Sequence, residues 1–187
     1  MNKMNQPVNL KLKICLLGDI AVGKTSLVRR SVRNKFNENY HPTIGSMTYR
    51  KNITIKRPDL HSDFNLELTI WDITGQISFK KLLHPHYLRG AKGAILMCDL
   101  TKRETLDNLH EWLDSVSSVC KKVPSVFIAN KSDCTDNFEF SASEIESTAS
   151  EFNSPFLTTS AKSGDNIENV FRILGNEIIN DWVNIDV

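Results

Sequence analysis

Short apolar runs alternate along this chain with segments whose apolar residues recur at helical spacing. Two segments, Asn52–Lys56 and Leu66–Ile70, alternate between apolar and polar positions as half-buried strands do. We expect Arg57–Asn65 to join them as a long hairpin turn. The apolar runs that predict strands are Leu10–Leu17, Leu66–Trp71, Ala94–Asp99, Ser125–Ala129 and Phe156–Thr158.

Helical patterns occupy the intervals between the later strands. Leu106, Leu109, Leu113 and Val116 share one face of a predicted helix, and Ser141-Ala142-Ser143-Glu144 has the form of a capping box that opens another. Strand–helix alternation predicts an α/β fold with a mostly parallel sheet, which binds ligands beyond the carboxyl ends of its strands. A last helix is predicted by an apolar stripe that suits a core: Ile167, Val170, Phe171, Leu174, Ile178 and Trp182.

Length, charge and cysteine spacing limit the classes of protein to which this chain can belong. The 187 residues suggest one domain, which we expect at residues 10–183, between an extended or disordered segment (1–9) and a short tail (184–187). The net charge of +1 gives no electrostatic argument for nucleic acid as a partner. No apolar run has the length of a membrane span, and the four cysteines show no metal-binding spacing. A reduced, cytoplasmic compartment fits best.

Residues 18–25 have the spacing G-x-x-x-x-G-K-[ST] between a predicted strand and a predicted helix. The glycines permit a tight loop whose backbone N–H groups face phosphate oxygens, and the helix N-terminus adds its dipole. The Lys24 ammonium can reach the β- and γ-phosphates, and the Thr25 hydroxyl can bind Mg²⁺. The sequence therefore predicts a nucleotide site that includes Asp19, Ile20, Ala21, Val22, Gly23, Lys24, Thr25 and Ser26.

A second polar motif, Asp72-Ile73-Thr74-Gly75-Gln76, follows the predicted strand at Leu66–Trp71. A carboxylate at this strand end, beside the phosphate loop, can hold Mg²⁺ through water. Gly75 lets the backbone approach a γ-phosphate closely, and Gln76 could orient an attacking water. Taken alone, this pattern is more often an ordinary turn.

Two further motifs follow the last strands. In Asn130-Lys131-Ser132-Asp133, the Asp133 carboxylate can accept from both N1–H and the 2-amino group of guanine, a donor pair that adenine lacks. The Lys131 stem can pack along the base, and Asn130 can brace neighbouring loops. The backbone of Ser160-Ala161-Lys162 could reach the guanine O6. These patterns predict a guanine nucleotide as the ligand.

The order of these motifs resembles the small GTPases of the Ras superfamily over about residues 10–183. The resemblance implies a P-loop G domain, with a six-stranded sheet that has one antiparallel strand and is flanked by five helices. It implies Mg²⁺-dependent binding of GTP and GDP, slow GTP hydrolysis and a two-state switch. Residues 36–46 and 73–85 would be the two switch segments, which contact effector, exchange-factor and activating proteins.

The resemblance also assigns individual residues. Thr43 would close on Mg²⁺ and the γ-phosphate, Phe36 would pack beside the guanine, and Tyr40 would cover the phosphates. Thr25 and Thr43 would bind Mg²⁺ directly and Asp72 would act through water, while Lys24, Thr43 and Gln76 would carry catalysis. Three motifs look most like the Rab branch: Ile44-Gly45, Trp71-Asp72 and Tyr87-Leu88-Arg89-Gly90-Ala91.

Several departures from the Rab pattern bear on function. After the switch threonine this chain has Ile44-Gly45-Ser46-Met47-Thr48 instead of Ile-Gly-Val-Asp-Phe, so the aromatic residue of the usual effector surface is missing. The stretch from Thr43 to Trp71 is several residues longer than in typical Rabs, mostly around Pro58–Asn65. The chain also lacks a prenylation box and a glycine after Met1. We expect no membrane anchor in this chain, so membrane association would need a removed lipidated tail or a partner.

Two alternatives stay open at this point. A P-loop kinase that uses ATP would need an arginine-rich lid and an acceptor pocket, and the sequence shows neither. A slow or non-hydrolysing nucleotide-bound scaffold is kept open by Ile20, because the family often has Gly or another small residue at this position.

Overall fold

The computed structural model describes residues 6–36, 42–76, 85–120 and 122–185. One six-stranded sheet runs through it in the order β2-β3-β1-β4-β5-β6, and β2 is antiparallel to β3 whereas all other neighbours are parallel. The expected sheet is confirmed. Its strands are β1 (Val8–Leu17), β2 (Ser46–Arg57), β3 (Ser62–Ile73), β4 (Gly93–Asp99), β5 (Ser125–Asn130) and β6 (Phe156–Thr158).

Helices cover both faces of the sheet. Alternate residues of β1 point to opposite faces, so Ile14 and Leu16 join the core under α1 (Lys24–Arg33) and α6 (Ile167–Ile185), while Cys15 and Leu17 join the core on the other face. That second core lies under α3 (Arg103–Asp107), α4 (Leu109–Cys120) and α5 (Ala142–Glu151). The α/β architecture with five flanking helices in the described residues is therefore as expected.

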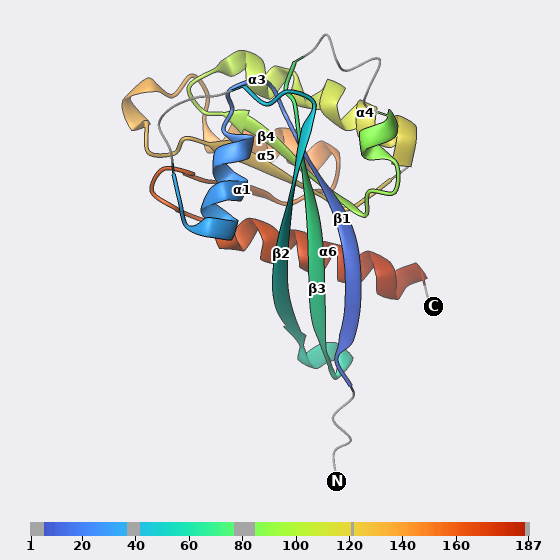
Figure 1. Cartoon of the computed structure of the whole chain (residues 1–187). Coiled ribbons are helices and arrows are strands. Elements are labelled where there is room, and N and C mark those ends of the chain that lie inside the picture. Colours follow the sequence, from blue (N-terminus) through green and yellow to red (C-terminus); the bar gives the residue numbers. More distant parts are fainter. Residues whose placement is uncertain (1–5, 37–41, 77–84, 121, 186–187) are drawn as a thin grey trace.

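The β2–β3 hairpin corrects one expectation. Strand pairing continues from Ser46↔Ile73 to Arg57↔Ser62, so the expected long turn at Arg57–Asn65 is wrong. The turn consists of one 3-10 helix, η1 (Pro58–Leu60), and the residue after it. Figure 1 shows this hairpin and β1 extending together below α6. The extension is stabilised by burial, because Ile55 and Phe64 are 4% and 2% exposed in the core beside α6.

Helix α6 covers the apolar face of the extended hairpin. The Phe64 and Trp182 rings meet edge to face with centroids 6.0 Å apart. Nearby, an Arg57 guanidinium N–H donates to Asn180 Oδ1 over 2.8 Å. These contacts explain why β2 and β3 continue to the hairpin turn despite their polar residues. The residues that face α6 still bury apolar surface there.

The helices differ from the sequence pattern in one other place. The expected helix through Leu106 and Val116 is interrupted at Asn108, where α3 ends and α4 begins. By contrast, the predicted capping box at Ser141 and Glu144 is present at the start of α5.

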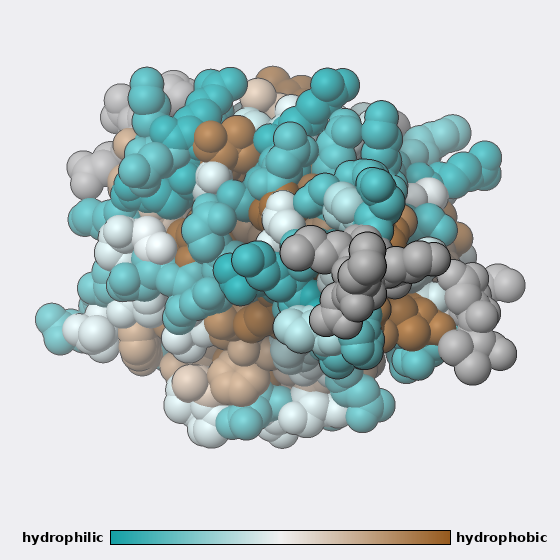
Figure 2. Space-filling view, turned by 90° about the horizontal axis from the view of Figure 1, so that it is seen from below, coloured by the Kyte–Doolittle hydropathy of each residue, from teal (hydrophilic) through white to brown (hydrophobic). Residues whose placement is uncertain are grey.

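Within the described residues, no helix is both long and apolar enough to cross a membrane. Seen from below, the surface carries separate apolar patches bounded by hydrophilic residues (Figure 2).

Candidate functional site

The loop between β1 and α1 crosses the upper end of the sheet, where glycine is required twice. Gly18 has φ +137°, and a Cβ there would lie 2.0 Å from the Met97 carbonyl oxygen. Gly23 has φ +105°, and its Cβ would lie 2.3 Å from Asn130 Nδ2. Both residues combine a left-handed backbone with close packing, so a side chain at either would displace the loop. The loop thereby brings Lys24 and Thr25 to the start of α1.

Lys24 is buried beneath this loop. Its ammonium donates to the carbonyl oxygens of Gly18 and Asp19, each over 2.7 Å. Burial lowers the Lys24 pKa to about 8, although the Asp72 and Asp19 carboxylates counteract this shift. A buried ammonium beside neutral carbonyls is well placed to exchange these contacts for phosphate oxygens, which carry full negative charge.

Three oxygen-bearing side chains that the sequence assigns to a metal ion meet beside Lys24. The Thr25 hydroxyl donates to Asp72 Oδ2 over 2.5 Å, and it lies 3.0 Å from the Thr43 hydroxyl. Asp72 is fully buried at the end of β3, and burial raises the pKa of its carboxyl while the Thr25 hydrogen bond and Lys24 oppose that shift.

This group fits a divalent cation. Hydroxyl and carboxylate oxygens are ligands that Mg²⁺ prefers. Moreover, Asp72 Oδ1 is buried and has no hydrogen-bond partner among the described residues. A buried carboxylate oxygen without a partner is costly, and a metal ion or one of its waters would satisfy it.

The carboxyl ends of β5 and β6 form the opposite side of the site. The Ser160 hydroxyl donates to Asp133 Oδ1 over 2.6 Å. Burial raises the Asp133 pKa, but this hydrogen bond and others outweigh it, so the net pKa lies below the usual value. Lys131, at φ +66°, places its ammonium 2.5 Å from Oδ2 of the fully buried Asp99. The Asn130–Asp133 turn thus carries the Asp133 carboxylate and contacts a second one, Asp99, at the end of β4.

Asn130 links this turn to the phosphate loop. Its amide N–H donates to the Val22 carbonyl over 2.8 Å, and its Oδ1 accepts from the Thr159 hydroxyl and the Ala161 N–H over 3.1 Å each. One buried side chain thus ties together three loops that come from three strand ends. Arg30 of α1 adds to this by donating to the carbonyls of Ala161 and Lys162.

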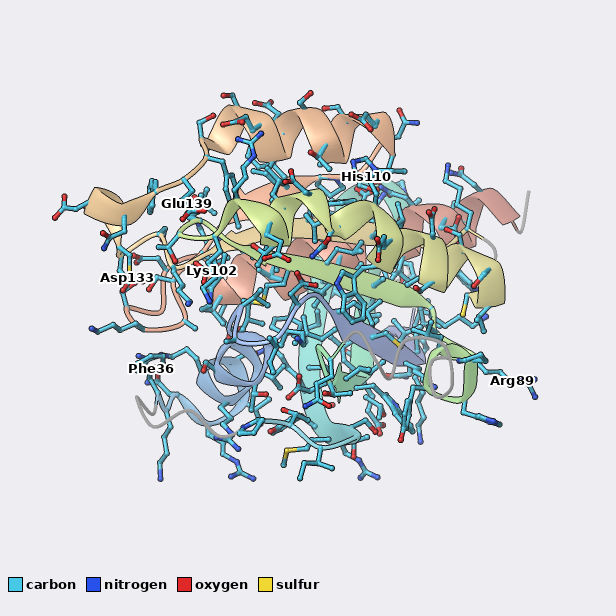
Figure 3. The ribbon with its side chains drawn as sticks, turned by 90° about the horizontal axis from the view of Figure 1, so that it is seen from above. Phe36, Arg89, Lys102, His110, Asp133 and Glu139 are labelled. Atoms are coloured by element: carbon cyan, nitrogen blue, oxygen red, sulfur yellow. The ribbon has the colours of Figure 1, made fainter. Side chains whose placement is uncertain are left out.

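A cavity of about 280 Å³ joins the two sides of the site. In the view from above, Phe36 and Asp133 lie toward the same end of the molecule, and Arg89 lies at the opposite end (Figure 3). The predicted site residues that line the cavity are Ile20, Ala21, Gly23, Lys24, Thr25, Ser26, Phe36, Thr43, Gly75, Asn130, Lys131, Asp133, Ala161 and Lys162.

Other predicted residues do not line this cavity. Val22 is fully buried in the core under α1, and Asp72 and Ser160 lie behind Thr25 and Asp133. Gln76 is half-buried next to Gly75, outside the lining, and Tyr40 lies outside the described residues. The switch segments are described only in part for the same reason.

Asp19 has a side chain with a role that the sequence did not indicate. Its Oδ1 accepts from the Trp112 indole N–H and its Oδ2 accepts from the Asn108 amide, each over 2.7 Å. Both donors belong to the α3–α4 junction, so a buried carboxylate fastens the phosphate loop to that junction.

The cavity is also lined by residues to which the sequence analysis gave no role: Arg29, Lys35, Thr74 and Cys134. Arg29 follows Thr25 by one helical turn, and Cys134 directly follows Asp133. Helical spacing could have indicated Arg29, because residues four apart share a helix face. Thr74 lies within the Asp72–Gln76 motif, whereas Cys134 could be assigned to the cavity only from the folded loops.

Gly75 packs against the phosphate loop next to Ile20. A Cβ on Gly75 would lie 2.4 Å from the Asp19 carbonyl carbon and from the Ile20 nitrogen, so this contact requires glycine. The Ile20 side chain is 46% exposed and borders the cavity. An apolar side chain thus stands where the loop, Gly75 and the phosphate side of the cavity meet.

Comparison with known proteins adds to this geometry. Residues 13–180 match the Ras family model. Ras-related protein Rab-22A of Mus musculus is 37% identical over 86% of this chain and 80% of its own length. Ras-related protein RABA4b of Arabidopsis thaliana is 33% identical over 92% and 75%, respectively. Ras-related protein RIC1 of Oryza sativa subsp. japonica is 32% identical over 95% and 85%.

Proposed function

Because this chain belongs to the Ras family and is a small GTPase of the Rab type, we propose that it works as a Mg²⁺-dependent GTP/GDP switch in vesicle trafficking or signalling. One observation carries the proposal: a single cavity has the Thr25 and Thr43 hydroxyls, with Asp72 behind Thr25, on one side and Asp133 on the other. This arrangement suits a ligand with a metal-bound polyphosphate and a base that offers two adjacent donors.

At the phosphate side, the loop N–H groups, the α1 N-terminus and Lys24 would bind the phosphates. Thr25 and Thr43 would hold Mg²⁺ directly and Asp72 would do so through water. When bound, the metal ion would neutralise charge on the β- and γ-phosphates. Exchange of the Lys24 contacts with Gly18 and Asp19 for phosphate oxygens keeps the ammonium hydrogen-bonded throughout.

At the base side, Asp133 would accept from N1–H and the 2-amino group of guanine, and Phe36 and the Lys131 stem would pack against the ring. The Ser160–Lys162 backbone would bind O6. Since Asn130 holds this backbone and the phosphate loop together, base and phosphate recognition share one rigid frame.

For hydrolysis, Gln76 would orient water toward the γ-phosphorus and Lys24 would stabilise the charge that develops in the transition state. The described residues hold Gln76 next to the Gly75 contact with the phosphate loop. Without a partner's contribution, the expected rate is roughly 10⁻³ s⁻¹ or less.

Hydrogen bonds join the two segments that would act as switches. The Thr74 N–H donates to the Gly45 carbonyl over 2.9 Å, and Ser46 pairs with Ile73. Ile44 and Met47, on the same stretch, are 90% and 43% exposed. A γ-phosphate contact at Thr43 or Gly75 would therefore be transmitted to an exposed apolar surface that effector, exchange-factor or activating proteins could recognise.

The direct test is binding and single-turnover hydrolysis of a fluorescent GTP analogue by the purified chain. We expect Mg²⁺-dependent binding, displacement by GTP but not by ATP, and slow conversion to the diphosphate. Equal displacement by ATP would contradict guanine recognition. Binding that is unaffected by Thr25→Asn would contradict the assigned metal site.

A second candidate is a nucleotide-bound scaffold that hydrolyses GTP too slowly to switch. Ile20 favours it, since this apolar side chain borders the space where Gln76 and an activating residue would have to meet. The same single-turnover assay separates the two: a scaffold retains intact GTP even when cell extract supplies activating proteins.

A further inference from the structure

Arg29 lies in the nucleotide cavity although no motif includes it. It follows Thr25 by four residues on α1, so both side chains lie on one face of the helix. The residue is half-buried and lines the cavity together with Thr25 and Thr43. Arg29 is therefore on the side of the cavity that carries the two threonine hydroxyls assigned to the metal ion.

The place of Arg29 in the cavity brings its charge close to the residues assigned to Mg²⁺. It shares the cavity lining with Thr25 and Thr43, and the Thr25 hydroxyl donates to Asp72 Oδ2 over 2.5 Å. Inside a partly enclosed cavity an interaction between charges is several-fold stronger than in bulk water.

The three arginines of α1 have different surroundings. Arg30 donates to the carbonyls of Ala161 and Lys162, on the base side of the site. Arg33 lies in the last turn of the helix and is exposed. Of the three, Arg29 alone lines the cavity.

We propose that Arg29 supplies a fixed positive charge to the phosphate site and thereby makes nucleotide retention less dependent on Mg²⁺. The inference rests on the proposed function, because it assumes a metal-bound polyphosphate in the cavity. A fixed cation attracts the phosphates and repels a second cation nearby. The guanidinium and the metal ion thus both stabilise the negative charge of the bound phosphates. The free-energy coupling between metal binding and nucleotide binding is therefore smaller than it would be without Arg29.

The test is a ratio of release rates. Protein loaded with a fluorescent GDP analogue is mixed with excess GDP, once with millimolar Mg²⁺ and once with EDTA. The ratio of the EDTA rate to the Mg²⁺ rate measures the coupling. In Arg29→Met, which keeps length and removes charge, we expect this ratio to rise about tenfold, as expected for one charge lost from a partly enclosed phosphate site. Arg29→Lys should restore a ratio near that of the wild type.

Arg33→Met is the matched control, because it removes the same charge from the same helix at an exposed position. Its ratio should equal that of the wild type. Arg29→Gln serves as a second neutral variant, and circular dichroism checks that each variant is folded.

An unchanged ratio in folded Arg29→Met and Arg29→Gln would overturn the proposal, and so would an equal rise in Arg33→Met. Failure of Arg29→Lys to restore the ratio would also overturn it, because the effect would then be due to shape rather than charge. Wild-type protein that retains no guanine nucleotide even in Mg²⁺ would instead overturn the proposed function itself, and this inference with it.

Discussion

At the scale of single residues, the site separates side chains that face a ligand from side chains that hold the site in shape. The side chains of Asp133 and Thr25 line the cavity, whereas the Asp19 carboxylate bonds to the α3–α4 junction. Asn130 also lines the cavity, but its amide is hydrogen-bonded to the neighbouring loops. The first group should control affinity and selectivity, and the second should control rigidity. Substitutions in the two groups are therefore expected to differ in kind.

Asp133→Asn should exchange guanine for xanthine selectivity. The wild type should prefer guanine over adenine nucleotides by at least roughly 10³-fold, because adenine leaves the carboxylate unpaired. An amide reverses part of the hydrogen-bond pattern and matches the 2-oxo group of xanthine. Competition binding with GTP, ATP and XTP measures this. Asp136→Asn, an exposed carboxylate in the following turn, is the control and should leave all three affinities unchanged.

Ile20→Gly should raise intrinsic single-turnover hydrolysis several-fold and leave GDP affinity within a few-fold. The reason is that a stiff, β-branched side chain is removed from the space beside Gly75. Equal or slower hydrolysis in Ile20→Gly would mean that Ile20 is a passive part of the loop.

Gln76→Leu should slow hydrolysis and leave GTP binding intact, since this side chain acts in the transition state.

Cys134 offers a chemical readout of base binding. It lines the cavity beside Asp133, and burial together with that carboxylate raises the pKa of its thiol. Because the thiolate is the reactive form, maleimide labelling should increase as pH rises past the ordinary thiol pKa. Bound GDP should slow the labelling, whereas ADP should not. Cys134→Ser reports the background from Cys120, and protection that survives this substitution would contradict the prediction.

At the scale of elements, the site lies at strand ends and helix starts, and most of these were predictable from the sequence. The phosphate loop, the Asp72 turn and the Asn130 turn were expected at strand ends because buried apolar runs stop directly before them. The long hairpin was not, since its inward-facing residues are buried by α6, a contact distant in sequence. For the same reason the sequence could not show that Asp19 bonds to the α3–α4 junction.

Trp112→Phe tests that junction. Loss of the indole N–H leaves one oxygen of buried Asp19 with one fewer donor, which should destabilise the fold by about 1–3 kcal/mol. We also expect faster nucleotide release, because the phosphate loop is less firmly held. Chemical denaturation and fluorescent-GDP release measure the two effects. Trp182→Phe changes a tryptophan that packs on the hairpin instead, and it should leave release unchanged.

At the scale of the whole molecule, two cores share one sheet, and the ligand would sit where loops from both faces meet. Alternate residues of β1 and β4 belong to opposite cores, so the phosphate loop is anchored by both. The α1 and α6 core supports Thr25 and Arg29, while the α3–α5 core supports Asp19 through Trp112. Destabilisation of either core should therefore weaken nucleotide binding, and bound nucleotide should in turn stabilise the whole domain.

The position of β1 has a consequence for synthesis on the ribosome. This first strand is central in the sheet: Ile14 pairs with Ile70 on one side and with Gly93 on the other. Such distant pairing must close long loops before it is stabilised. The nascent chain should therefore leave β1 open to proteases until β4 has left the exit tunnel. Arrested chains of increasing length, treated briefly with protease, should show protection of β1 only after residue 99 has emerged; protection in shorter chains would contradict this.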